Sequence, residues 1–572
     1  MKKILSVVLA FCLVFGMFAI TASATEGDLI VTVANDIHYN SHYTSKNTGK
    51  HNSVNADFAH VLSDDKMTHE GLAIISAFLE AAGTNESDYV IFPGDLADRG
   101  IKEEAYKVAS MFREFEAKYG KQIYVVPGNH DLMKTTVAEF REIYAEFGYN
   151  EAIASHSKTA SYVVDLKDNY RLIAIDSCTP GTGKHGINAE LVSWLTQQCN
   201  QAKADGKKVF AMMHHNLLEH FILGSTIHSG GVVGTKVEGF ADALAKGGVK
   251  YIFTGHTHDS DVTMYTADDG SVIYDVVTPT LLTYTCPYRV VEFGKNVKIE
   301  TRHIDKIDIS YLNNLGISEN ALKLAESNFT EYSRISTFVG LEAFFTNFLT
   351  GKNLKNLLKL EDEQMNAIIE KAADKLCETL KMPIEKADEI EEGKSLESLA
   401  EKYDTEIPDT DYKNLIDVAI QLYVAHNLGD ENYPTYSDEV VLIVRGVAIA
   451  LGYALADVTA EEYATVMSFL FSLADIKVPV DFLKYAGSGI KRMEGIEIYI
   501  TTVLVPFLGE FTVDNAPADN NVTLPGYNYT ADDEDIADPK GENMTIWEKI
   551  TAFFNKIFDS LKTLFTFLPW VD

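Results

Sequence analysis

Residues 89–100 read YVIFPGDLADRG, a short apolar run that ends in glycine, aspartate and arginine. The β-branched and aromatic residues predict a buried strand. In an open α/β sheet the ligand crevice lies at the carboxyl ends of the strands, which is where the polar residues of this segment fall. The segment therefore predicts an α/β fold with a polar site at the end of a strand.

Four further strand-like runs end in the same way. LIVTVA at 29–34, IYVVP at 123–127, KVFAMM at 208–213 and YIFTG at 251–255 are followed, within two residues, by DIH, GNHD, HH and HTH. Any one of these clusters is common by chance, but five in order at strand ends are not. Their carboxylate, imidazole and amide groups suit two divalent first-row ions (Mn, Fe, Co, Ni or Zn) better than calcium or magnesium.

The ordered set DxH, GDxxDRG, GNHD, a histidine after a strand and GHxH resembles the calcineurin-like metallophosphoesterases over about residues 29–304. The resemblance implies a four-layer α/β/β/α sandwich of two mixed sheets, with the metals at the strand ends. It implies one metal held by Asp36, His38 and His258, a second held by Asn129, His214 and His256, and a bridging ligand, Asp95. It also favours His214 over His215 as the ligand after its strand.

The same resemblance suggests how the site would work. Two neighbouring cations lower the pKa of a shared water and hold a phosphate in line, so the expected nucleophile is a metal-bound hydroxide. His130 is not needed as a ligand and is the expected acid for the leaving alkoxide. The resemblance assigns the orientation of His130 to Asp98, with Asp131 as the weaker alternative. Arg99 offers a fork that matches phosphate oxygens, but a structural salt bridge explains it equally well.

The domain organisation follows from a change of pattern along the chain. Strand and helix patterns alternate from Leu29 to about Ile304, and hairpin-like runs close this part. Beyond Asp305 long helical patterns follow without strands, such as 361–380 and 439–455. We therefore expect a metallophosphoesterase domain at 25–304 and an all-α domain of unknown role at 305–530. The second domain shows no internal repeat and no catalytic constellation.

The N-terminus has the three parts of a secretory signal peptide. Two lysines precede the apolar run from Ile4 to Ile20, and Ala22-Ser23-Ala24 follows it. The run is short for a bilayer anchor, and no basic stop-transfer cluster follows it. We expect cleavage after Ala24, which removes residues 1–24, and a protein that is secreted or held at the extracellular cell surface.

The C-terminal region combines an acidic segment with an amphipathic one. Residues 531–543 (ADDEDIADPKGEN) predict an unpacked linker. Residues 544–572 carry apolar side chains at steps of three and four, with lysines between them, which predicts one helix. This helix either docks on the protein or on a second copy of it, or makes a peripheral membrane contact.

Composition restricts the partners. The formal charge is 49 − 83 = −34, and no basic stripe offsets it, so nucleic acid is disfavoured and a small phosphoester is the expected substrate. The mature chain keeps four cysteines without metal or redox spacing, for which we expect buried free thiols, with one disulfide as the alternative. They are Cys178, Cys199, Cys286 and Cys377.

Three polar loops border the predicted site. The insertion at 40–65, with His42, His51 and His60, is either a substrate loop or, more simply, a solvated surface loop. The loops at 178–188 and 216–235 are candidates to gate the pocket. The substrate contacts that we would test in them are His185, His220 and His228.

Together these features predict an exported, dinuclear-metal-dependent phosphoesterase that hydrolyses a phosphomonoester or a phosphodiester. Export makes a protein phosphatase less favourable, and the acidic charge disfavours a nuclease. The alternative is a cell-surface or membrane-associated interaction protein whose metal site is vestigial.

Overall fold

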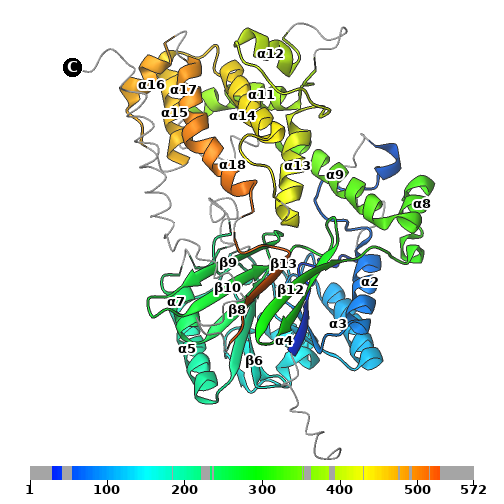
Figure 1. Cartoon of the computed structure of the whole chain (residues 1–572). Helices are drawn as coiled ribbons and strands as arrows, with labels where there is room; N and C mark the ends of the chain where they lie inside the picture. Colours follow the sequence, from blue (N-terminus) through cyan, green and yellow to red (C-terminus); the bar gives the residue numbers. More distant parts are fainter. Residues whose placement is uncertain are drawn as a thin grey trace, which may run out of the picture.

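The structure is a computed structural model, and Figure 1 shows the whole chain. It describes residues 29–41, 55–182, 184–220, 232–234, 237–350, 352, 363–385, 393–429, 431–473, 477–488, 492–514 and 516–527. The predicted signal peptide at 1–24, linker at 531–543 and amphipathic helix at 544–572 lie outside the described residues, as do His42, His51 and His228.

The first sheet has six strands in the order β13-β12-β11-β1-β2-β3. Its members are β1 (Leu29–Val33), β2 (Tyr89–Phe92), β3 (Gln122–Val125), β11 (Pro287–Phe293), β12 (Asn296–His303) and β13 (Asn521–Pro525). Strands β1, β2 and β3 are parallel, with Val33 opposite Ile91, whereas β11, β12 and β13 pair antiparallel. The carboxyl ends of the three parallel strands therefore meet at one edge.

The second sheet has seven strands in the order β4-β5-β6-β7-β8-β10-β9. They are β4 (Ala154–Ser155), β5 (Tyr162–Asp165), β6 (Tyr170–Ile175), β7 (Lys208–Met213), β8 (Val249–Thr254), β9 (Asp261–Thr266) and β10 (Val272–Val277). The central strands β6, β7, β8 and β10 are parallel, and the outer strands are antiparallel. Both sheets are mixed, as expected.

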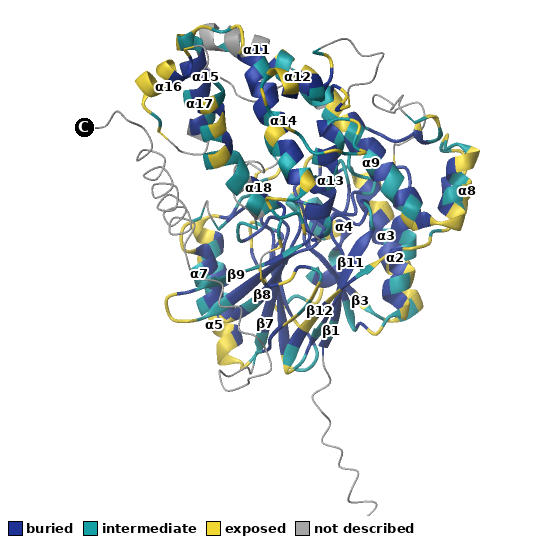
Figure 2. Cartoon of the chain, turned by 45° about the horizontal axis from the view of Figure 1, so that its top comes forward, coloured by how far each residue is buried: buried dark blue, intermediate teal, exposed yellow. Residues whose placement is uncertain are grey.

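Helices cover the outer face of each sheet, so that the domain has four layers. Helices α2 (Gly71–Thr84), α3 (Lys102–Tyr119) and α4 (Val137–Ile143) pack on the first sheet, and α5 (Ala189–Ala204) and α7 (Phe240–Lys246) pack on the second. Each layer of helices packs on its sheet through an apolar core. A further apolar core, which includes Val31, Phe253 and Phe293, fills the space between the two sheets. Figure 2 shows these strands as mostly buried. The four-layer α/β/β/α sandwich is confirmed.

Helix α3 illustrates how the outer helices attach. Its buried residues Val108, Ala109, Phe112 and Phe115 recur at the spacing of one helical face. The Phe112 ring stacks on Phe92 of β2 with the ring centroids 4.6 Å apart. The helix thus fixes the strand that leads into the GDLADRG segment.

The second half of the described chain is helical, which confirms an all-α part after the sandwich (Figure 1). Its helices are α8 (Glu319–Ser327), α9 (Phe329–Phe348), α11 (Glu363–Lys381), α12 (Leu396–Lys402), α13 (Leu415–Leu428), α14 (Asp438–Ala454), α15 (Ala460–Leu473), α16 (Val480–Ala486), α17 (Arg492–Tyr499) and α18 (Val505–Phe511). Among the described residues, no helix combines the length and apolar character that a bilayer crossing requires.

Strand β13, like the short strands β4 and β5, was not indicated by the sequence pattern. It lies inside the 305–530 range, yet it pairs with β12, with Leu524 opposite Val297. The Tyr251 hydroxyl donates to the Pro525 carbonyl over 2.7 Å. A five-residue strand that pairs with a partner more than 200 residues away carries no local signal. The chain therefore returns from the helical part to complete the first sheet.

The helical part is joined to the sandwich at the C-terminal end of α13. The Asn520 amide donates to the Leu428 carbonyl over 2.6 Å, and the Ser260 hydroxyl donates to Asn520 Oδ1 over 3.1 Å. Ser260 lies two residues after His258, so the contact sits beside the predicted site. The four cysteines at 178, 199, 286 and 377 are buried and free, as expected.

Candidate metal centre

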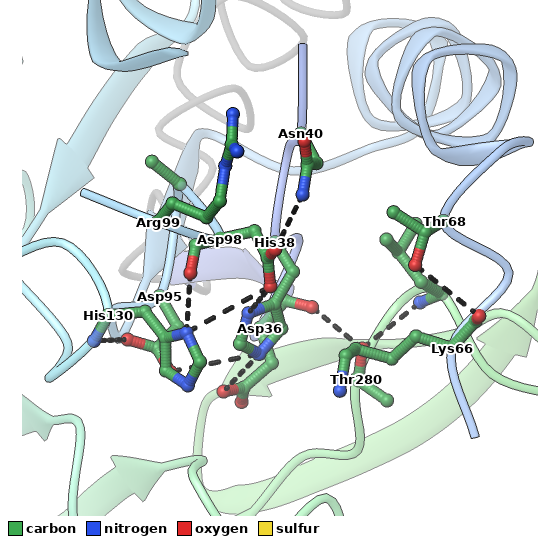
Figure 3. A network of polar contacts seen from close by, with 12 residues as sticks. Asp36, His38, Asn40, Lys66, Thr68, Asp95, Asp98, Arg99, His130 and Thr280 are labelled. Carbon is green, nitrogen blue, oxygen red and sulfur yellow. Dashed lines mark hydrogen bonds and ion pairs between the residues drawn. The ribbon is translucent and has the colours of Figure 1, made fainter. Parts of the chain in front are cut away.

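The five polar clusters converge at one end of the two sheets. Asp36 and His38 follow β1, Asp95 follows β2, Asn129 and His130 follow β3, His214 follows β7, and His256 and His258 follow β8. Three overlapping groups of these side chains place their ligand atoms within 4.8 Å of one another: Asp36, His38 and His258; His38, Asp95 and His130; Asp36, Asp95 and His214. Figure 3 shows the cluster from close by.

The first predicted ligand group is closely packed. The Nε2 atoms of His38 and His258 lie 3.4 Å apart, and each lies 3.7 Å from Asp36 Oδ1. Ligand atoms bound about 2.1 Å from a tetrahedral ion are themselves about 3.4 Å apart. Asp36 Oδ1 is buried and makes no hydrogen bond to any described residue. The three groups therefore fit a divalent cation.

The second predicted group is centred on His214. Its Nε2 lies 2.9 Å from Asn129 Oδ1, 3.2 Å from His256 Nδ1 and 3.3 Å from Asp95 Oδ2. Asp95 Oδ2 also lies 3.7 Å from His38 Nε2. The Asp95 carboxylate thus faces both groups, which is the place of a bridging ligand.

Backbone strain is concentrated on the same residues. Asp36, His38, Asp95, His256 and His258 all have a positive φ, between 35° and 71°. Residues other than glycine seldom adopt this conformation, which costs on the order of 1–3 kcal/mol each and gathers at functional sites. The strained backbone of these five residues therefore lowers the local stability, while it directs their side chains toward the centre.

The carboxylates and imidazoles of the centre lie close enough to shift one another's pKa values. Burial raises the pKa of Asp95, but the charges of His214, His130 and His38 outweigh it and hold the pKa well below its usual value. Burial lowers the pKa of His38, but contacts with carboxylates, Asp36 foremost, raise it to about 10. The carboxylates of the centre are therefore ionised, as ligands for a cation must be, whereas the raised pKa of His38 means that its proton has to leave when a cation binds.

His130 stands at the open side of the centre. Its side chain is 39% exposed, and its Nδ1 lies 2.6 Å from the main-chain carbonyl of Asp98. The Asp98 carboxylate is 3.9 Å from the same Nδ1, and it accepts a hydrogen bond from the Asn40 amide over 2.6 Å. Asp98 thus contacts His130 mainly through its backbone. The Asp131 carboxylate accepts hydrogen bonds from the backbone of Leu96, Ala97 and Gly128 instead.

Arg99 does not face the centre. Its guanidinium makes two contacts, of 3.3 and 3.4 Å, with Oε1 of the buried Glu104, and its backbone N–H donates to Oε2. Figure 3 shows the guanidinium pointing away from Asp36, Asp95 and His130. Of the two explanations that the sequence left open, the geometry matches the structural salt bridge.

The neighbouring histidines have separate surroundings. His215 Nδ1 lies 2.8 Å from the Ser177 hydroxyl, and its ring packs on His256 with the centroids 4.5 Å apart. His185 is half-buried on the loop that follows β6. His220 is buried between Asp261 and Asp275, at 2.6 and 3.2 Å, which leaves it no surface for substrate.

The insertion at 40–65 is only partly described, and the described part is not a solvated loop. His60 is buried and lies 3.1 Å from both Glu70 Oε1 and the Tyr332 hydroxyl. Asp65, at the end of the insertion, lies 3.1 Å from His258 Nδ1 through Oδ2. Sequence reasoning missed Asp65 because it belongs to no spaced motif. Its only signal is the charged triplet Asp64-Asp65-Lys66 ahead of a helix.

Comparisons with known proteins find relatives for part of the chain. Residues 29–260 match the family model of calcineurin-like phosphoesterases. A protein of Arcobacter nitrofigilis named a probable glycerophosphodiester phosphodiesterase is 36% identical over 128 residues, which cover 22% of this chain and 41% of the relative. A cAMP/cGMP dual specificity phosphodiesterase of Mycobacterium tuberculosis is 28% identical over 128 residues, which cover 22% of this chain and 36% of that protein.

The chain thus spans less than half the length of these two relatives. Among solved structures, a dimetal phosphatase from Danio rerio aligns with a TM-score of 0.35 at 9% identity, over 49% of this chain and 98% of that one.

Proposed function

Since residues 29–260 match the family model of calcineurin-like phosphoesterases, we propose that the protein is an exported hydrolase of small phosphoesters that uses two divalent metal ions. The observation that carries the proposal is the pair of ligand groups that share Asp95, with interatomic distances of 2.9–3.7 Å. When bound, two such ions supply Lewis-acid activation of water and of the phosphoryl oxygens. Mn, Fe, Zn, Co and Ni all suit these nitrogen and oxygen ligands.

His130 is the residue that we expect to protonate the leaving alkoxide. With Nδ1 hydrogen-bonded to the Asp98 carbonyl, Nε2 is left for the substrate, and it can give a proton to the leaving group only while the imidazole is protonated on both nitrogens. The ring is partly exposed, so a bound ester has access to it. The backbone N–H of His130 donates to Asp95 Oδ1 over 2.8 Å, which ties the acid to the bridging carboxylate.

A phosphodiester is the substrate class that the surroundings favour. A monoester carries about two negative charges near neutral pH, whereas a diester carries one. Two cationic side chains of the segments that border the centre are already paired, Lys66 with Asp64 and Asp65 and Arg99 with Glu104. Because these cations are already neutralised by carboxylates, they do little to stabilise the second negative charge of a monoester. The two curated relatives described above are both named as phosphodiesterases.

The test uses residues 25–572 purified without added metal. Metal content is measured by mass spectrometry, and hydrolysis of p-nitrophenyl phosphate and bis-p-nitrophenyl phosphate is compared between the wild type and Asp95→Asn. We expect about two ions per chain, preference for the diester, and at least a ~100-fold lower rate in the variant because a bridging ligand loses its charge. No retained metal and no hydrolysis with added Mn or Zn would support the interaction protein with a vestigial site.

Export and membrane contact are part of the proposal and rest on the sequence at the two ends. Expression with the native N-terminus should give a mature chain that begins at Thr25 outside the cytoplasm. Liposome sedimentation of residues 25–572 and 25–543 tests the C-terminal segment. Equal sedimentation of the two forms would argue against the membrane contact and favour docking on protein.

A further inference from the structure

We propose that Asp65 is a positioning residue for the metal ligand His258, and that helix α9 of the helical part holds Asp65 in place. The inference rests on the proposed function, because it assigns His258 to a metal. The inference also assigns the helical part a structural role at the metal centre, although that part supplies none of the predicted ligands.

The contact between Asp65 and His258 is of the kind that orients metal-binding imidazoles. Asp65 Oδ2 lies 3.1 Å from His258 Nδ1, while His258 Nε2 faces Asp36 and His38. A carboxylate on one ring nitrogen keeps the proton there, so that the other nitrogen presents its lone pair to the ion. Both rotation of the ring and the wrong tautomer are disfavoured.

The Asp65 carboxylate is itself fixed by a buried cation. Lys66 Nζ lies 3.3 Å from Asp65 Oδ1 and 2.9 Å from Asp64 Oδ1, and the Lys66 side chain is 14% exposed. One Asp65 oxygen therefore meets His258 and the other meets Lys66. Figure 3 shows Lys66 together with Thr280, whose hydroxyl donates to the Asp36 carbonyl over 2.7 Å.

Helix α9 lies directly against the backbone of this segment. A Cβ on Gly340 would stand 2.1 Å from the Asp64 carbonyl oxygen and 3.1 Å from that of Leu62. The Asn347 amide donates to the Ser63 hydroxyl over 2.9 Å. Only glycine allows this approach, so α9 and residues 62–65 cannot move independently.

The opposite side of the segment is held by the loop between β10 and β11. The Thr283 hydroxyl donates to the Asp65 carbonyl over 3.3 Å, and the Met67 N–H donates to the Leu282 carbonyl over 2.8 Å. The same loop is joined to α9, because the Tyr284 N–H donates to the Thr337 hydroxyl over 3.0 Å. Asp65 is thus clamped between α9 and a loop of the sandwich.

The first experiment replaces the carboxylate. Asp65→Asn should weaken binding of one Mn²⁺ by about 10–100-fold, the usual effect of losing a partner of a ligating histidine. Mn²⁺ affinity is measured by competition with a chelator, and rates are measured across a Mn²⁺ titration. The rate should recover at high Mn²⁺, which a folding defect would not allow. Asp168→Asn is the matched control, since Asp168 lies beside Lys167 in the turn before β6, whereas the predicted ligands follow the carboxyl ends of the strands, and it should bind Mn²⁺ as the wild type does.

The second experiment acts from the helical part. Gly340→Ala should push residues 62–65 away and weaken the same Mn²⁺ site by about 10-fold or more, by the sensitivity of such sites to shifts near 1 Å. Gly509→Ala in α18 is the control, because its Cβ would meet Thr435 Cγ2 at an ordinary 3.5 Å.

The outcomes separate the two proposals. Wild-type Mn²⁺ affinity in both Asp65→Asn and Gly340→Ala, with the wild type binding two ions and hydrolysing esters, overturns this inference and leaves the proposed function standing. A wild type that binds no metal overturns both. Loss of affinity in Asp65→Asn alone would retain the role of Asp65 and reject that of α9.

Discussion

The backbone of Gly128 lies against the carboxylate of Asp95, so closely that a Cβ on Gly128 would stand 2.1 Å from Oδ1. The same oxygen accepts a hydrogen bond from the His130 N–H over 2.8 Å. The loop after β3 thus wraps around the bridging carboxylate. Because the contact has no spare room, any side chain at residue 128 must displace Asp95 or the loop.

We therefore expect Gly128→Ala to lose metal and activity together. A shift near 1 Å at a catalytic group costs about 100-fold in rate, so kcat/KM should fall by about that factor and the second ion should bind more weakly. Metal content and hydrolysis of bis-p-nitrophenyl phosphate are the measurements. Gly509→Ala serves again as control. Unchanged metal content and rate in Gly128→Ala would show that the loop does not need to touch Asp95.

The role of His130 predicts an effect that depends on the leaving group. His130→Gln should lower kcat by about 10²–10⁴-fold for an ester of a simple alcohol, because the leaving alkoxide then lacks its proton donor. An ester of p-nitrophenol needs little protonation and should lose far less. Equal losses for both substrates would instead indicate that His130 binds metal or substrate, and metal analysis of the variant distinguishes these two.

The sequence predicted an α/β fold with polar clusters at the strand ends because both leave local signals, whereas the two-sheet sandwich followed from the family resemblance. The five strands that lead into the clusters are short apolar runs, and each cluster closely follows one, as His256 and His258 follow β8. Residues that act across long distances left no such signal. Among the described strands, β13 pairs with β12 alone, and Asp65 reaches His258 from 193 residues away.

The ambiguous residues were those whose chemistry serves two purposes equally well. Arg99 has the fork that fits phosphate, but the same fork fits a carboxylate, and Glu104 lies five residues further along the chain. His220 lies on a loop beside the predicted site, yet its ring nitrogens contact Asp261 and the buried Asp275. Only the tertiary packing distinguishes a side chain aimed at a ligand from one aimed at the protein.

Arg99 should therefore matter more to stability than to the reaction. Arg99→Ala leaves Glu104 without its cation, but the guanidinium is 38% exposed, so water replaces part of the contact. We expect a loss of about 1 kcal/mol in the free energy of unfolding, measured with urea, and a kcat/KM within about threefold of the wild type. A KM raised by 100-fold at unchanged stability would show instead that Arg99 binds the phosphate.

His220 gives a pH-dependent prediction away from the predicted ligands. Its Nδ1 lies 2.6 Å from Asp261 Oδ2, and its Nε2 lies 3.2 Å from Asp275 Oδ2. Burial alone lowers the pKa of His220, but the charges of Asp275 and Asp261 raise it to about 10. The charged imidazole is therefore a structural cation between the buried carboxylate of Asp275 and the partly exposed one of Asp261.

The sign of the effect follows from the two pKa values. An unfolded histidine titrates near pH 6.5, so the contribution of His220 to stability is complete below that pH and declines as the pH rises toward 10. His220→Gln should cost about 3–5 kcal/mol at pH 6, as removal of one partner of a buried ion pair does, and clearly less at pH 10. Urea unfolding at pH 6, 8 and 10 measures the difference from wild type. His156→Gln is the control, because burial lowers the pKa of His156 and its cost should stay level from pH 8 to 10. A His220→Gln cost that does not shrink with pH would mean that the imidazole is neutral in the fold.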